Sequence, residues 1–172
     1  MKKYFFLFAL PLSTLLTEVK NEKSPDQKRY QALTEIAQIM GKDSTPYLKD
    51  YAANPHWFLR NAAIKSLSDL GIKDEEAFKK ALFDDSLIVR LSALEGIEKL
   101  KMSQLSSAIW QMFMKQENYS LIQGVKKRDN ILKTAVIVLG RLGEEQSITR
   151  LKSMRTNSKY QDLWSSIDLL KL

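Results

Sequence analysis

LRNAAIKSLSDLG at residues 59–71, VRLSALEGIEKLK at 89–101 and ILKTAVIVLGRLG at 131–143 align when the chain is compared with itself. Each copy carries a small residue at the same register, namely Ala63, Ala93 and Ala135. Apolar residues follow one, four and seven positions later, which is the spacing of one stripe along an α-helix. A weaker fourth copy fits at Ala32, so the alanines recur after 31, 30 and 42 residues. A repeat of helices therefore decides the fold.

Shorter apolar patterns lie between these stripes, at residues 46–51, 77–82, 105–113 and 148–154. Asn54 precedes Pro55 as a capping residue precedes the first position of a helix. Glycines stand where the main helices should end, at Gly41, Gly71 and Gly143. Because one helix pair cannot bury its own apolar face, the copies must stack. The pattern predicts an all-α fold, an α-α superhelix of about four helix pairs within residues 27–172.

Composition agrees with a helical chain and removes several classes of site. The 172 residues include 6 glycines, 4 prolines and no cysteine. Without cysteine the chain forms no disulfide, thiolate zinc site, iron–sulfur cluster or cysteine nucleophile. The formal net charge is +7, but the basic residues are spread along the sequence, which is typical of a solvated surface. The three tryptophans stand at apolar helical positions and are expected in the core: Trp57, Trp110 and Trp164.

The N-terminal segment has the build of a secretory leader. MKK at residues 1–3 is a positive start, and an apolar stretch of 13 residues follows at 4–16. We expect a signal peptide or N-terminal anchor at 1–17 and a linker at 18–26. No small-x-small pair precedes a cut after Thr17, so cleavage stays open, and the alternative is a buried N-terminal helix. Export predicts a protein that is periplasmic or secreted by a bacterium, with membrane contact only through an uncleaved leader.

The start of the main helices resembles HEAT repeats. Asn54 and Asp84 stand six residues before Arg60 and Arg90, and an alanine follows each arginine three residues later. The interval of about 30 residues is similar to the short bacterial type found in phycobilisome-lyase-like proteins. The resemblance covers roughly residues 27–155. It implies a structural ladder between repeats, which would be formed by Arg60, Asp84 and Arg90.

One interval is longer than the others because of an insertion at 115–130, KQENYSLIQGVKKRDN. Insertions in repeat proteins emerge as loops on one face and often bind partners, although a merely tolerated insertion is the alternative. Second helices usually line the concave side in this type of solenoid. The candidate partner-binding residues therefore lie on second helices and in the insertion: Lys79, Lys80, Lys126, Lys127, Arg128, Arg150, Lys152 and Arg155.

The sequence offers no catalytic constellation. His56 is the single histidine, so neither a histidine-based triad nor a site of several histidine ligands can be assembled. Carboxylates occur as neighbouring pairs, for example Glu75-Glu76, which point to different sides of a helix and fit caps better than a shared pocket. We therefore predict no catalytic residue, cofactor or metal, and a protein that is not an enzyme.

These observations favour an exported, non-enzymatic scaffold that binds another protein. The first alternative is nucleic-acid binding by a basic concave face, which is less favoured because aromatic residues for base stacking are sparse. The second alternative is a lyase accessory subunit, as the phycobilisome-type resemblance implies. Neither the partner nor the oligomeric state can be derived from the repeat itself.

Overall fold

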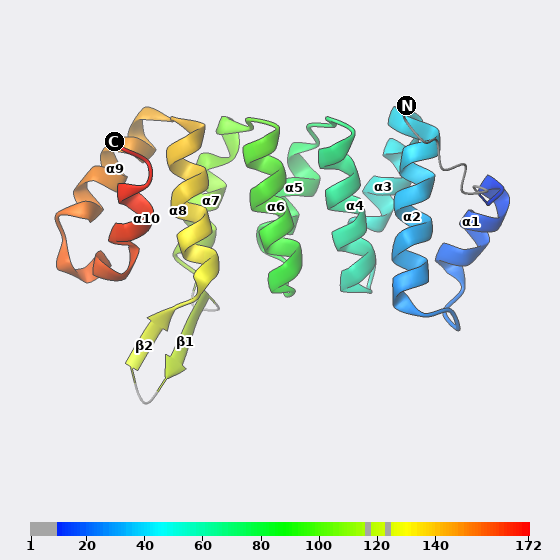
Figure 1. The fold of residues 1–172 in the computed structure, drawn as a ribbon, viewed down its shortest axis with the longest axis horizontal. Coiled ribbons are helices and arrows are strands. Elements are labelled where there is room, and N and C mark those ends of the chain that lie inside the picture. Colours follow the sequence, from blue (N-terminus) through cyan, green and yellow to red (C-terminus); the bar gives the residue numbers. More distant parts are fainter. Residues whose placement is uncertain (1–9, 116–117, 123–124) are drawn as a thin grey trace, which may run out of the picture.

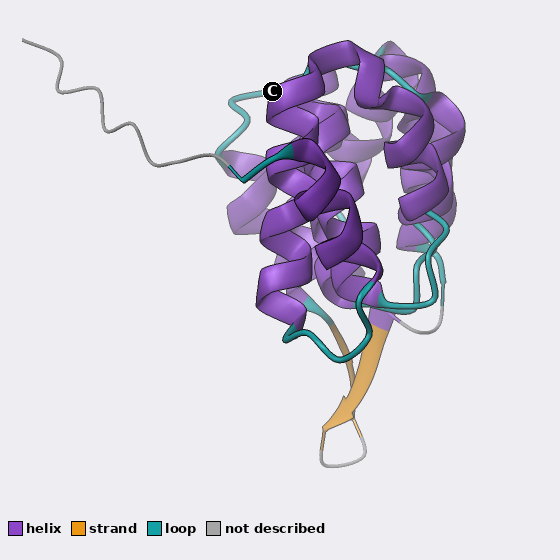
Figure 2. Ribbon diagram, turned by 90° about the vertical axis from the view of Figure 1, so that its right-hand side faces the viewer, coloured by secondary structure: helices purple, strands orange, loops and turns teal. Residues whose placement is uncertain are grey.

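The helices of this protein stack in two layers (Figures 1 and 2). The computed structural model describes residues 10–115, 118–122 and 125–172, with the backbone alone at 119–122 and 125–128. One layer holds the first helices of the repeats: α2 (Asp26–Met40), α4 (Trp57–Asp69), α6 (Leu87–Lys99) and α8 (Asn130–Leu142). The other holds the second helices: α3 (Thr45–Tyr51), α5 (Glu75–Ala81), α7 (Ser106–Phe113) and α9 (Glu145–Arg155). The predicted solenoid of helix pairs is confirmed.

Short 3₁₀ segments join or extend these helices. They are η1 (Gly41–Ser44), η2 (Ser103–Leu105) and η4 (Ser158–Leu163). The last of them leads into α10 (Trp164–Asp168), which packs on α8 and α9. Leu163 and Ile167 are buried there, and the side chain of Leu170 lies against Gly140 of α8. The C-terminal segment therefore covers the open end of the stack, as its helical apolar spacing suggests.

Small residues let the first helices approach one another closely. Ala63, Ala93 and Ala135 are fully buried, and Ala32 is nearly so. The packing around α6 is tight, because a Cβ atom added at Gly96 would lie only 2.4 Å from Cε1 of Phe78. The alanines that align in the sequence repeat are therefore the residues buried where the first helices pack against one another.

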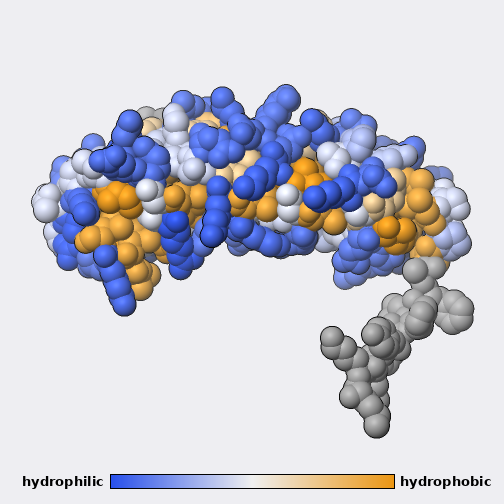
Figure 3. Space-filling model, turned by 90° about the horizontal axis from the view of Figure 1, so that it is seen from above, coloured by the Kyte–Doolittle hydropathy of each residue, from blue (hydrophilic) through white to orange (hydrophobic). Residues whose placement is uncertain are grey.

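The stack bends into a shallow arc with the first helices on the inner side (Figure 3). The first helices pack against one another in series, whereas α3, α5 and α7 lie mainly against the first helices and stand farther apart. A layer that is more closely spaced takes the inside of the curve. The expectation that second helices line the concave side was therefore wrong.

The N-terminal helix α1 (Leu12–Lys20) packs against α2. Leu15 and Val19 are each only 1% exposed, and Nε of the buried Arg29 donates a hydrogen bond of 3.0 Å to the carbonyl oxygen of Val19. Residues 18–20, expected in a linker, are thus helical, because Val19 completes an apolar stripe with Leu15. Residues 1–9 of the expected leader lie outside the described residues. Among the described helices, none combines the length and apolar character that crossing a lipid bilayer requires.

The insertion contains a β-hairpin, which is the exception to the all-α expectation. Strand β1 (Tyr119–Ile122) pairs antiparallel with β2 (Val125–Arg128), with Tyr119 opposite Arg128 and Ile122 opposite Val125. The hairpin projects from the edge of the stack where α8 begins (Figure 1). Two short runs separated by two residues, one of them Gly124, have the spacing of a hairpin.

The first helices end in left-handed backbone conformations. Gly41, Gly71 and Gly143 all have positive φ angles, as the stop signals in the sequence predict. At the end of α6 the same role falls to Lys101, with φ of 53°. A residue with a Cβ is strained in this conformation, whereas glycine is not.

We predict that Ala93→Leu lowers the free energy of unfolding by about 1–3 kcal/mol, because the crossing of α4 and α6 has no room for a larger side chain. Lys99→Ala is the control on the same helix, since Lys99 is exposed and its pair with Asp69 is a surface ion pair. Urea denaturation measures both variants. Equal effects would show that the repeat register is misplaced.

A second prediction concerns the end of α6. Lys101→Gly should raise the free energy of unfolding by about 0.5–1 kcal/mol, because it relieves the left-handed strain while loosening the unfolded chain. Gly71→Lys, the reverse change at the end of α4, should destabilise, and no neighbour of Gly71 would touch the new Cβ. Thermal and urea denaturation would contradict the assignment if the two variants changed stability in the same direction.

The packing of α1 gives a third prediction. Leu15→Ala should destabilise the chain by about 2–4 kcal/mol, since it removes a fully buried side chain. Thr14→Ala on the exposed side of α1 serves as the control and should change stability by less than about 0.5 kcal/mol. If Leu15→Ala were neutral in urea denaturation, α1 would not belong to the folded domain.

Candidate partner-binding surfaces

An arginine–aspartate contact joins the second and third repeats. Nε and Nη2 of Arg60 donate to the two carboxylate oxygens of Asp84 at 2.6 and 2.7 Å. Nη1 of Arg60 donates to the carbonyl oxygens of Asn54 and Pro55, both at 2.9 Å. The hydrogen bond to Asp84 raises the pKa of Arg60. Both residues hold the loops before α4 and α6 in place and are largely shielded from solvent, so their role is to stabilise the contact between the two repeats.

The ladder stops at Arg90. Its Nη1 donates to the carbonyl oxygens of Asp84 and Asp85 at 2.6 and 3.2 Å, but its buried Nε has no hydrogen-bond partner in the described part of the chain. The sequence explains the difference, since the residue that corresponds to Asp84 in the next repeat is Lys126. Among the described side chains, the junction between α6 and α8 therefore lacks the partly buried charge pair of the preceding one.

The basic candidates on the second helices do not form one stripe. Lys80 pairs with Glu76 on α5 at 2.8 Å, and Arg155 pairs with Asp168 and lies over the ring of Trp164. Helix α7, which separates α5 from α9, has no basic residue. Exposed Lys79 and Lys152 make no ion pair with a described carboxylate. Besides Arg150, three candidates remain, and their side chains lie outside those that the structure describes: Lys126, Lys127 and Arg128.

Three clefts run between neighbouring second helices. The cleft between α3 and α5 measures about 80 Å³, that between α5 and α7 about 410 Å³, and that between α7 and α9 about 530 Å³. Neighbouring clefts share wall residues, with Glu76 common to the first two and Gln104 and Ser107 common to the last two. The clefts therefore form a row along the outer face of the arc.

The α7/α9 cleft is the largest and carries the most polar side chains. Its walls are Ser103, Gln104, Ser106, Ser107, Trp110, Glu144, Gln146 and Arg150. The indole Nε1 of Trp110 donates to Oγ of Ser147 at 2.9 Å, and Oγ of Ser147 donates to Oε2 of Glu144 at 2.7 Å. These bonds link the second helices of the third and fourth pairs through side chains that the sequence separates by 37 residues.

Glu144 caps α9 and stays ionised. Its carboxylate accepts hydrogen bonds from Oγ and the backbone nitrogen of Ser147 and from the backbone nitrogen of Gln146, and these bonds lower its pKa below the usual range. The N-terminus of a helix favours negative charge, so this position stabilises the ionised form of Glu144.

Arg150 stacks on the face of Trp110. Its guanidinium carbon lies 4.0 Å from the ring centroid, and Nη2 lies 3.8 Å from Sδ of Met114. No described carboxylate is within ion-pair distance of Arg150. Only its charge makes Arg150 a candidate in the sequence, because no local pattern indicates its contact with Trp110, which comes from a different repeat.

An apolar group lies at the edge from which the hairpin projects. Trp57 is 44% exposed at the start of α4, and Leu87 and Ile88 are exposed at the start of α6. The expectation that Trp57 belongs to the core was wrong, because it is the first residue of α4 and stays exposed at the edge of the stack. Trp110 is buried and Trp164 is partly buried, as expected of core tryptophans.

Within the described ranges, no group of three or more His, Asp or Glu side chains is gathered closely enough to hold a metal ion. His56 contacts the ring of Phe58, with 5.5 Å between the centroids. Its backbone nitrogen donates to the side chain of Asn54. These contacts give His56 a place in the turn before α4.

Comparison with known proteins agrees with the stacked helix pairs. A family model described as HEAT repeats matches residues 12–98, which is half of the chain and begins at α1. No curated protein matches the sequence. The matched residues include the alanine stripes of α2, α4 and α6 and the Arg60–Asp84 contact. This protein therefore belongs to the HEAT-repeat family.

Proposed function

We propose that this protein is a non-catalytic scaffold that binds a partner protein along its second helices. HEAT repeats generally mediate contacts between proteins. The observation that carries the proposal is the row of three adjoining clefts over α3, α5, α7 and α9. A row of clefts that share walls suits an extended segment or a helix edge better than a single small molecule.

Contacts between repeats hold this surface in shape before a partner arrives. Oγ of Ser92 donates to the side chain of Asn61 at 2.7 Å between α6 and α4. On the outer face, Lys49 pairs with Asp74 at 2.9 Å, and Gln104 donates to Glu75 at 2.8 Å. A surface that is already ordered loses little conformational entropy on binding, which favours affinity.

The charges along the clefts favour a protein over a nucleic acid. Glu75, Glu76 and Glu144 stand in the walls beside Lys79 and Arg150. A phosphate backbone carries a charge at every nucleotide and gains affinity from an uninterrupted basic surface, which a wall of mixed sign does not offer. A protein segment presents both charges and amide groups, so it can match a wall of mixed sign.

We also propose that the protein is exported to the bacterial periplasm or envelope, on the strength of the positive start and the apolar residues at 4–16. Because α1 packs on α2, we propose that the leader is cleaved before Leu12 rather than after Thr17. The alternative is that the leader is not cleaved and anchors the protein in the membrane. Cell fractionation with mass spectrometry of the N-terminus tests this. Cytosolic protein with an intact Met1 would overturn export, and a mature chain that begins at Glu18 would overturn the position of the cut.

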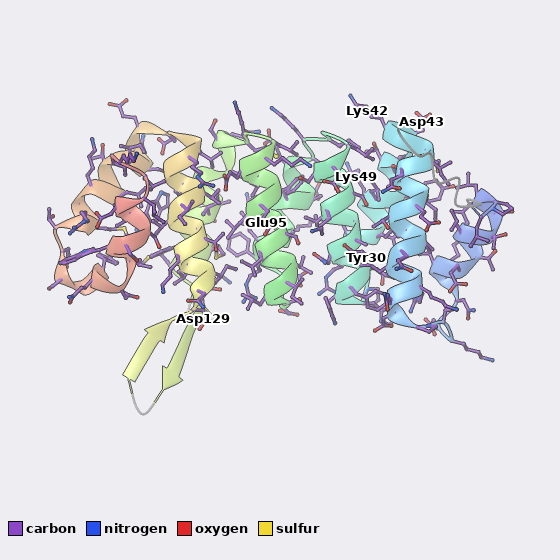
Figure 4. All side chains as sticks on the ribbon, viewed as in Figure 1. Tyr30, Lys42, Asp43, Lys49, Glu95 and Asp129 are labelled. Carbon is purple, nitrogen blue, oxygen red and sulfur yellow. The ribbon has the colours of Figure 1, made fainter. Side chains whose placement is uncertain are left out.

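The scaffold proposal predicts that filling the clefts blocks the partner. The partner would be isolated from the envelope fraction, identified by mass spectrometry and purified. Ser107→Trp places a large ring in the two larger clefts and should weaken the complex by at least about tenfold in calorimetry. Glu95→Trp places the same ring on the first-helix face, where Glu95 of α6 is exposed (Figure 4), and should leave affinity unchanged.

Both variants should unfold at the same urea concentration as the unmodified protein, since Ser107 and Glu95 are exposed. Loss of binding with Glu95→Trp alone would move the interface to the inner face. Full binding by Ser107→Trp would refute the use of the clefts.

A further inference from the structure

We propose that the α7/α9 cleft binds an acidic side chain of the partner and that Arg150 is the group that recognises its carboxylate. The inference rests on the proposed scaffold function and assigns a chemistry to one part of the interface. It depends on how Arg150 is held, on the state of Glu144, and on an unsatisfied hydroxyl group in the cleft wall.

Arg150 is held in place without using its charge on an acid. The guanidinium lies over the indole ring of Trp110, and the ring is fixed in turn by the hydrogen bond from its Nε1 to Ser147. A stacked guanidinium binds the ring through its face, which leaves Nε and Nη1 at its edge without a described acceptor, while Nη2 contacts Sδ of Met114. This edge is the part that binds a carboxylate through two parallel hydrogen bonds.

The other exposed arginines with described contacts have acids of their own. Arg141 pairs with Glu98 at 2.6 Å, and Arg155 pairs with Asp168. Arg150 alone in this set is stacked and lacks a described carboxylate. An ordered arginine in a cleft wall that makes no ion pair with a described carboxylate is complementary to an acid on a partner.

Glu144 does not fill this role, although it lies in the same cleft. Its oxygens already accept three hydrogen bonds from the first turn of α9, and these bonds hold its pKa low. Glu144 thus has donors of its own and makes no ion pair with Arg150, which leaves Arg150 for a carboxylate that enters the cleft.

Ser106 supplies the independent sign of a missing ligand atom. It is only 4% exposed and belongs to the cleft wall, and its hydroxyl has no hydrogen-bond partner among the described residues. A buried hydroxyl without a partner is unfavourable. Its Oγ is itself buried, so the side chain must turn about χ1 before the hydroxyl can reach an oxygen atom bound in the cleft. Arg150 and Ser106 both belong to this wall, and neither donates to a described oxygen atom.

The size and connection of the cleft fit a side chain on an extended segment. A volume of about 530 Å³ accommodates a glutamate side chain with its flanking backbone. Through Gln104 and Ser107 the segment would continue into the α5/α7 cleft, where exposed Lys79 makes no pair with a described acid. The partner motif is therefore an extended stretch with an acidic residue at Arg150, and its continuation meets Lys79 beside Glu75 and Glu76.

The test uses the full-length protein labelled with ¹⁵N and a synthetic probe, acetyl-Gly-Glu-Glu-Gly-amide. The indole N–H resonance of Trp110 is the reporter, because its ring forms the floor beneath Arg150. It should shift progressively as this peptide is added, less so at higher salt, and it should stay in place with the glutamine analogue, acetyl-Gly-Gln-Gln-Gly-amide. Equal shifts with both peptides would overturn the proposal.

The variants separate recognition from folding. Arg150→Gln should lower the affinity for the glutamate peptide by about tenfold or more. Arg150→Lys keeps the charge but loses the two parallel hydrogen bonds, so its affinity should lie between those of Arg150→Gln and the unmodified protein. Arg141→Gln removes an equal charge from α8 and should bind as the unmodified protein does. Retained binding by Arg150→Gln, or equal loss in Arg141→Gln, would refute the assignment.

Failure of this inference is distinguishable from failure of the scaffold. If Ser107→Trp releases the natural partner while the glutamate peptide shifts no resonance, the clefts bind a protein but not through an acid at Arg150. If the partner stays bound to Ser107→Trp, the scaffold proposal itself fails, whatever the peptide does.

Discussion

The close approach of the first helices is the constraint on which the structure depends. Ala63, Ala93 and Ala135 remove side-chain bulk where these helices cross, so the inner layer is tightly spaced. The second helices cannot follow at the same spacing, and the stack curves away from them. The clefts on the outer face are the direct geometric result. A contact that serves stability thus also creates the surface offered to a partner.

Much of the fold could be predicted from the sequence because it depends on local periodicity. The alanine stripes define both the helices and the faces that they bury, and Gly71 and Gly143 mark where helices end. The link between Arg60 and Asp84 came from a resemblance to repeats whose spacing is preserved here. Each of these features repeats along the chain, so one copy supports the interpretation of the next.

Features that occur once were harder to predict. The curvature depends on the relative spacing of two layers, which no single stripe specifies. The N-terminal stretch is apolar enough to suggest a leader, and its alternative as a buried helix became visible only in the contacts of Leu15 and Val19 with α2. The position of Arg150 over Trp110 joins two repeats through an unrepeated pair, so periodicity carries no signal for it.

The arginine ladder ends at the junction between α6 and α8, so this junction is held together differently from the one before it. Between α4 and α6 the repeats are joined by a partly buried charge pair, whereas at the next junction Arg90 pairs with no described carboxylate and the connecting chain forms the hairpin. Helix α7 belongs to the repeat before this junction and α9 to the repeat after it, so a ligand in their shared cleft contacts both repeats. Binding there adds its free energy to the weaker junction. The partner would then hold the third and fourth repeats in one relative orientation, and its affinity would depend on the curvature of the arc.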